Sequence, residues 1–256
     1  MIIRYTKYKI LTTYYYIMRI FVFMSDNRKL ENKIGSAEYN SLAAAINYEY
    51  CKKYNYDFIY YRPYLNDKDT IKLENCIDPN TNKLRHSAWS KLLSTSLALK
   101  LNYDYVVYID SDCIFKDFNQ SLEGFITPHT KQDIIFLNNK PWGNYRPCSG
   151  FYVCKVCDNT RHMINSWYNF DFKEKRNPCR FEQGALWCTY KDSIYDIGIV
   201  DSWMFREEAG QFLRHVGTHE KQQRMPYFSA FIKSNNIDYE ANIQKITVIE
   251  FNTNTK

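Results

Sequence analysis

The sequence predicts an α/β fold with a mixed, mostly parallel central sheet flanked by helices, and three observations predict it. The chain has 256 residues, 45% of them hydrophobic, which is enough for a large buried core. Short apolar runs alternate with segments of helical spacing, as in strand-helix-strand units. The run Tyr105–Ile109 holds only aromatic and β-branched residues, which is typical of a strand buried on both faces.

The charge and cysteine content exclude some classes of protein. The net charge of +6 is mild, and Lys and Arg are scattered rather than clustered, which argues against nucleic-acid binding. Several of the eight cysteines lie inside apolar runs, and no framework of short loops surrounds them. We therefore expect reduced, structural thiols and a cytoplasmic setting.

The first half of the chain predicts a Rossmann-like half. Residues 1–17 are apolar and tyrosine-rich, but charges interrupt them, so we expect an N-terminal extension without a membrane span. A strand over 19–24, an amphipathic helix over 37–54 and a strand over 56–61 follow. Residues 62–85 are polar and predict a surface loop.

A helix is expected over residues 86–102, leading into the central strand. Its predicted apolar stripe consists of Trp89, Leu92, Leu93, Ser96, Leu97 and Lys100. Lys91 lies near the start of this helix, where a lysine is more often solvated than functional.

The second half predicts further strands over 134–137, 150–154 and 194–200, with helices over 159–170 and 181–190. A loop over 138–147 contains Trp142. From residue 233 onward the chain is polar and carries no specific signal. We therefore expect an extension (1–17), a single domain (18–232) and a polar C-terminal tail (233–256).

Two carboxylates follow the central strand directly, at Asp110 and Asp112. Side chains repeat every second residue along an extended chain, so both point toward one spot. Two like charges that close need a cation between them, and carboxylate oxygens suit Mg²⁺ or Mn²⁺. Ligands of open α/β sheets bind at this end of the strands, so the sequence predicts a metal site here.

A late segment over residues 211–228 contains further candidates. His215 and His219 lie on either side of Gly217, and Lys221 and Arg224 follow. Imidazole can complete a metal shell, and Lys and Arg can neutralise phosphates. The segment therefore has the groups that a diphosphate-metal site needs, with either histidine as a ligand.

Five landmarks in order give the chain a resemblance to a known family. They are a W-x-K helix at Trp89 and Lys91, the strand YVVYIDSD, Ser149-Gly150, an E-Q-x-A-L helix at Glu182 and Gln183, and a late H-x-G at His215. The chain resembles the GT-A fold nucleotide-sugar transferases, and most closely the galactosyl and xylosyl transferases of glycosyltransferase family 34. The resemblance covers about residues 19–228.

The resemblance implies transfer of galactose, glucose or xylose from a UDP-sugar to a glycan or protein-linked sugar, with retention of the anomeric configuration. It implies that Asp110, Asp112 and His215 hold Mn²⁺ or Mg²⁺ and that Glu182 and Gln183 lie near the anomeric carbon. The implied nucleotide-sugar-binding residues are Lys91, Ser111, Gly217, Lys221 and Arg224. The implied acceptor-binding residues are Trp142, Ser149 and Gly150.

The chain also departs from that family. Relatives usually read H-x-x-G-C where this chain has His215-Val216-Gly217, which keeps His219 open as an alternative ligand. Typical members carry an N-terminal membrane anchor and work in the Golgi, whereas we expect no anchor here. A soluble transferase from a large DNA virus or a protist fits that difference and the abundance of Tyr, Asn, Lys and Ile.

Two other classes compete with a transferase. A phosphohydrolase of the haloacid dehalogenase type also has D-x-D after a buried strand, but it requires Thr or Val two residues beyond the second Asp, where this chain has Ile114. A non-catalytic carbohydrate-binding protein of the same fold has no need of a metal site. The presence of Asp110, Asp112 and a late histidine argues against it.

Overall fold

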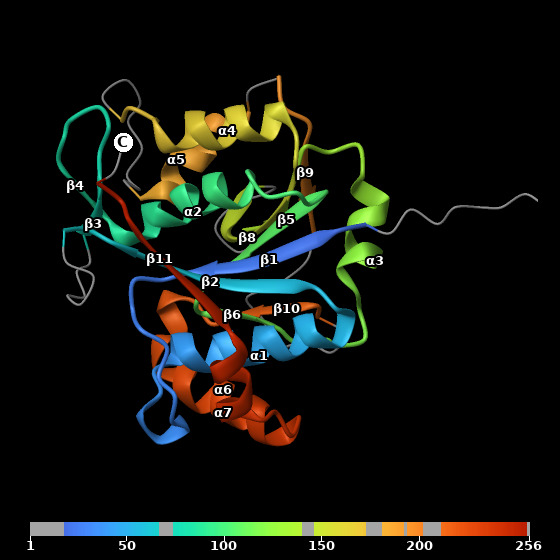
Figure 1. Ribbon diagram of the computed structural model, residues 1–256. Helices are drawn as coiled ribbons and strands as arrows, with labels where there is room; N and C mark the ends of the chain where they lie inside the picture. Colours follow the sequence, from blue (N-terminus) through green and yellow to red (C-terminus); the bar gives the residue numbers. More distant parts are fainter. Residues whose placement is uncertain are drawn as a thin grey trace, which may run out of the picture.

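A seven-stranded sheet in the order β11-β2-β1-β5-β8-β7-β9 runs through the middle of the computed structural model (Figure 1). The structure describes residues 18–66, 74–139, 146–172, 181–191, 194–201 and 211–254. Neighbouring strands pair in parallel except at β8, which is antiparallel to β5 and β7. The predicted mixed, mostly parallel sheet is confirmed.

The strands of this sheet are β1 (Ile20–Ser25), β2 (Asp57–Tyr64), β5 (Tyr105–Ile109), β7 (Ile134–Asn138), β8 (Pro147–Lys155), β9 (Ile197–Val200) and β11 (Thr247–Asn252). Two short antiparallel pairs lie outside it: β3 (Glu74–Ile77) with β4 (Leu84–His86), and β6 (Cys113–Phe115) with β10 (Leu213–His215).

Helices cover both faces of the sheet (Figure 1). One face carries α2 (Ser90–Ala98), α4 (Asp158–Tyr168) and α5 (Glu182–Thr189). The other carries α1 (Tyr39–Tyr54), α6 (Arg224–Ser234) and α7 (Tyr239–Lys245). The remaining helices are α3 (Leu122–Ile126) and the 3-10 turns η1 (Ile34–Ser36), η2 (Ser87–Trp89), η3 (Thr127–His129) and η4 (Thr218–Gln223).

The central strands contribute side chains to two hydrophobic cores, one under each layer of helices. In β5, Val107 and Ile109 belong to the core beneath α1, and Val106 and Tyr108 to the core beneath α2 and α4. This division follows from the alternation of side chains along a strand. Burial on both faces, predicted for β5, is therefore confirmed.

Two segments differ from the expectation. Residues 62–85 were predicted as a surface loop, but they include β3 and most of β4. Residues 233–256 were predicted as a polar tail, yet they contain α7 and the edge strand β11, which pairs with β2. Ile243 and Ile246 of this segment are buried in the core beneath α1. A few well-spaced apolar residues are enough to pack a segment of mostly polar composition against the core.

The described cysteines form no disulfide. None of the helices in the described part of the chain has the length and apolar character of a membrane-spanning segment. The predicted extension over residues 1–17 lies outside the described residues.

Candidate active site

The D-S-D sequence leaves the sheet at the carboxyl end of β5. The Asp110 N–H donates to the carbonyl of Gly150 on the neighbouring β8 (2.8 Å). The chain then turns, and the Cys113 N–H donates back to the Asp110 carbonyl (3.0 Å). Asp110, Ser111 and Asp112 thus lie in the tight connection between β5 and β6, where all three line one cleft.

The short β6–β10 pair brings in the late histidine. His215 lies opposite Cys113 in this ladder, and the Val216 N–H donates to the Asp112 carbonyl (2.9 Å). As a result, one ligand atom each from Asp110, Asp112 and His215 lies within 4.8 Å of the others. Two carboxylates and one imidazole form a donor set that fits Mn²⁺ or Mg²⁺.

Gly150 leaves room for this triad. A Cβ added at Gly150 would lie 3.0 Å from His215 Cε1 and 3.3 Å from Asp110 Oδ2. Both contacts are tighter than nearly all real Cβ contacts, so a side chain at this position would displace His215 or Asp110 by a few tenths of an ångström. The glycine of Ser149-Gly150 therefore has a packing role next to the proposed metal ligands.

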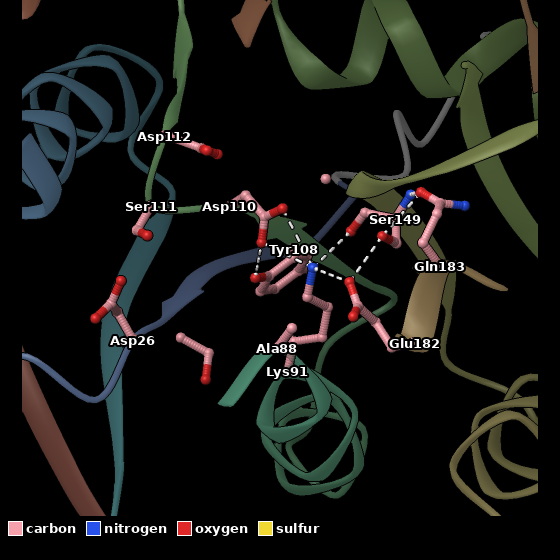
Figure 2. A network of polar contacts seen from close by, with 12 residues as sticks. Asp26, Ala88, Lys91, Tyr108, Asp110, Ser111, Asp112, Ser149, Glu182 and Gln183 are labelled. Carbon is pink, nitrogen blue, oxygen red and sulfur yellow. Dashed lines mark hydrogen bonds and ion pairs between the residues drawn. The ribbon is translucent and has the colours of Figure 1, made fainter. Parts of the chain in front are cut away.

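A buried lysine links the triad to the predicted catalytic helix (Figure 2). Lys91 Nζ lies 2.9 Å from Asp110 Oδ1 and 3.1 Å from Glu182 Oε1. Only 4% of the Lys91 side chain is exposed, so the expectation that a lysine here is solvated is wrong. The predicted apolar stripe of this helix is also offset, because Lys91, Ser94 and Thr95 are buried.

The first turn of α5 presents Glu182 and Gln183 to β8. Ser149 Oγ donates to Glu182 Oε1 (3.1 Å), and the Ser149 N–H donates to Gln183 Oε1 (2.8 Å). Gln183 Nε2 donates to the carbonyl of Pro147 (2.9 Å), so both ends of this amide are held by β8. Glu182 Oε2, in contrast, is buried without a hydrogen-bond partner among the described residues.

The charges of the triad are strongly interdependent. Burial alone would lower the pKa of His215, but the Asp112 carboxylate, 2.9 Å away, outweighs it and raises this pKa to about 10. Burial would raise the pKa of Asp112, yet the His215 and Arg224 cations lower it below its ordinary value. Burial raises the pKa of Asp110, and Lys91 offsets only part of that effect.

The cleft in front of the triad has a volume of about 430 Å³. Several residues that the sequence did not single out line it, notably Asp26 and Arg28 after β1 and Tyr39 at the start of α1. The Arg28 and Arg224 guanidiniums both lie over the Tyr39 ring, at 4.1 and 4.6 Å from its centroid. Asp26 ends a buried parallel strand, as Asp110 does, and that position was the signal available in the sequence.

Only some of the other predicted donor- and acceptor-binding residues line the cleft. Ser111 and Arg224 line the cleft, and Arg224 Nη2 lies 2.5 Å from Asp112 Oδ2. Gly217 precedes η4, and Lys221 within η4 is exposed and does not line the cleft. Trp142 and the side chain of His219 lie outside the described residues.

No protein-family model matches the chain, and no curated protein matches it either. Many solved structures resemble it, and two of them superpose with TM-scores above 0.5. A glycosyltransferase involved in the glycosylation of the major capsid of PBCV-1 superposes with a TM-score of 0.61 at 14% identity, over 82% of this chain and 98% of that one. The apo form of the glycosyltransferase GlyE from Streptococcus pneumoniae TIGR4 gives 0.52 at 11% identity, over 89% of this chain and 62% of that one.

Identities this low establish a shared fold and nothing finer. Membership of glycosyltransferase family 34 accordingly stays a prediction. The chain has the GT-A-like fold of these glycosyltransferases, which confirms the fold class expected from its sequence.

Proposed function

We propose that this chain is a metal-dependent glycosyltransferase that moves a hexose or pentose from a UDP-sugar to a glycan or protein-linked sugar. The observation that carries the proposal is the convergence of Asp110, Asp112 and His215 within 4.8 Å, at the carboxyl end of β5, on a glycosyltransferase fold. The donor set and its place in the sheet agree with a diphosphate-metal site.

The two carboxylates and His215 would hold Mn²⁺ or Mg²⁺ against the donor diphosphate. A divalent cation there supplies stabilisation of the negative charge that develops on the leaving nucleoside diphosphate. Arg28 and Arg224 lie beside Ser111 and Asp112 and are placed to meet the same charge. Lys221 is a further candidate if η4 moves toward a bound donor.

Glu182 is the better candidate of the two catalytic residues. Glu182 lines the cleft, and its buried Oε2 atom, without a hydrogen-bond partner among the described residues, is left to accept a bond from a ligand or a water molecule. A carboxylate at that point stabilises positive charge that develops on the sugar ring during transfer. Gln183 has both amide ends held by β8 and is a poor nucleophile, which favours front-face attack with retention over a covalent intermediate.

Ligand-dependent melting of the purified chain tests this function. UDP, GDP and a set of UDP-sugars are added with MnCl₂ or with EDTA. Binding at a hundredfold excess over Kd stabilises the folded state by about 2.7 kcal/mol, or about 5–10 °C for a protein of this size. We expect the shift with UDP and one UDP-sugar only when Mn²⁺ is present.

The control pair is Asp110→Asn and Asp158→Asn. Asp158 is fully exposed at the start of α4, so its variant should behave as the wild type. Asp110→Asn should fold and lose the Mn²⁺-dependent shift together with turnover of the donor. Phosphate release from p-nitrophenyl phosphate without any nucleotide shift would instead support the phosphohydrolase alternative, and an Asp110→Asn variant that keeps full turnover would overturn the metal site.

A further inference from the structure

A second cleft adjoins the first and is not used by the proposed donor site. Its volume is about 480 Å³, within the range of about 300–1,000 Å³ that is usual for small-ligand sites. It lies between the β3–β4 hairpin and the start of α5, and His86 lines both clefts. Phe181 lines the second cleft, and the next residue, Glu182, lines the first. The two clefts therefore meet at the start of α5.

Arg85 and Trp89 form a buried pair among the residues that line this cleft. The Arg85 guanidinium lies over the Trp89 ring, 4.0 Å from its centroid, and Arg85 Nη2 lies 3.0 Å from Asp78 Oδ2. Arg85 Nη1 also donates to the Tyr168 carbonyl (2.6 Å). Arg85 is 6% exposed and Trp89 2% exposed, so this stacked pair is in place before any ligand arrives.

The walls combine apolar and polar groups. Phe181 is 49% exposed and Leu84 58% exposed, although both are large apolar side chains at the edge of a cleft. The His86 and Phe181 rings pack edge to face at a centroid distance of 5.0 Å. Thr81 and Lys83 add a hydroxyl and an ammonium donor from the hairpin.

This lining fits a neutral ligand that has one apolar face and several hydroxyl groups. The charged side chains of the cleft are two acids and two bases, Asp78 and Asp171 with Lys83 and Arg85. The one group of metal-ligating side chains in the described part of the chain lies in the first cleft. A phosphorylated ligand therefore has no reason to prefer the second cleft, whereas the C–H face of a sugar ring packs against an exposed aromatic ring while its hydroxyls bond to the polar groups.

We infer that this second cleft binds a saccharide unit of the acceptor, with Phe181 as its aromatic platform and Lys83 as a hydrogen-bond donor. The inference rests on the proposed function and gives that function an acceptor site. A sugar against Phe181 and His86 extends toward Glu182, where the donor sugar is proposed to react. Phe181 and Lys83 then determine which acceptor is used and take no part in the chemistry.

The test starts from a defined glycan array probed with the full chain, followed by calorimetric titration of the tightest-binding glycan. Phe181→Ala should weaken that binding about tenfold or more, and Phe181→Tyr should restore it because the ring is retained. Lys83→Ala should weaken it by a smaller factor. Ile34→Ala, which removes another half-exposed apolar side chain, at 46% exposure, is the matched control and should leave the affinity unchanged.

Several outcomes would overturn the inference: no glycan retained on the array, equal affinity in Phe181→Ala and the wild type, or displacement of the glycan by UDP with Mn²⁺. The Mn²⁺-dependent UDP shift separates this failure from failure of the proposed function. If UDP raises the Tm as expected but glycan binding is unchanged in Phe181→Ala, only the inferred acceptor site is contradicted. If glycan binding depends on Phe181 but UDP causes no Tm shift, the saccharide site is supported and the proposed transferase function is contradicted.

Discussion

Replacing Lys91 by methionine tests the electrostatic arrangement of the site most directly. Lys91 is 4% exposed and pairs with both Asp110 and Glu182, at 2.9 and 3.1 Å. Burial alone would lower the pKa of Lys91, but these two carboxylates outweigh burial and raise it, so the lysine is charged at all ordinary pH values. Methionine fills most of the same space and removes the charge together with the hydrogen bonds that Nζ donates to Asp110 and to the Ser149 carbonyl.

The expected loss is large because two buried carboxylates remain behind. Removing one partner of a buried ion pair costs about 3–5 kcal/mol. We expect the lower end, about 3 kcal/mol, because Tyr108 still donates to Asp110 and Ser149 still donates to Glu182. For a protein of this size that corresponds to a Tm lower by about 6–12 °C.

The loss should also depend on pH and on metal. Without Lys91 the pKa of Asp110, already raised, rises further, so the folded state binds a proton that the unfolded state releases. Stability of the variant therefore falls as pH rises, and the difference from the wild type is larger at pH 8 than at pH 5. Mn²⁺ supplies positive charge at Asp110, so it should raise the Tm of the variant more than that of the wild type.

The assay is urea and thermal unfolding in EDTA or MnCl₂ at both pH values, with Lys100→Met as the matched control. Lys100 is an exposed lysine just after α2, and its replacement should change stability by less than about 0.5 kcal/mol. A Lys91→Met variant no less stable than Lys100→Met, or one whose deficit is the same at pH 5 and pH 8, would refute the reasoning.

Four further predictions concern the triad and the fold. Gly150→Ala places a methyl group 3.0 Å from His215 Cε1, so Mn²⁺ affinity measured by calorimetry should fall about tenfold or more, whereas Gly35→Ala, with open space around it, should leave it unchanged. Mn²⁺ must displace the His215 proton, so affinity should rise about tenfold per pH unit from pH 6.5 toward the folded-state pKa of about 10; a flat profile would contradict this. In the metal-free protein the contribution of the His215–Asp112 pair to stability is fully present below pH 6.5 and is lost as pH rises through about 10, which a stability profile in EDTA checks. A chain that ends with α6 lacks β11 and exposes the edge of β2, and it should show no cooperative unfolding transition by circular dichroism.

The sequence alone determined the sheet and one half of the candidate site. Five aromatic or β-branched residues in a row require burial on two faces, so Tyr105–Ile109 could be placed in the centre, with Asp110 and Asp112 at its carboxyl end. The closeness of these carboxylates follows from their separation of only two residues, although the chain turns between β5 and β6 instead of staying extended. The tail, in contrast, was misjudged, since docking of β11 depends on a partner strand far away in the chain.

Only the tertiary structure decided which distant groups join those carboxylates. The pairing of β6 with β10 places His215 beside Asp112, and nothing near either residue in the sequence encodes that register. The burial of Lys91 between Asp110 and Glu182 likewise depends on how α2 and α5 pack on the sheet. The spacing of apolar residues predicts a helix, but the side chains of neighbouring elements determine which face of that helix is buried. Here the neighbouring elements supply two carboxylates whose charge a buried lysine can neutralise.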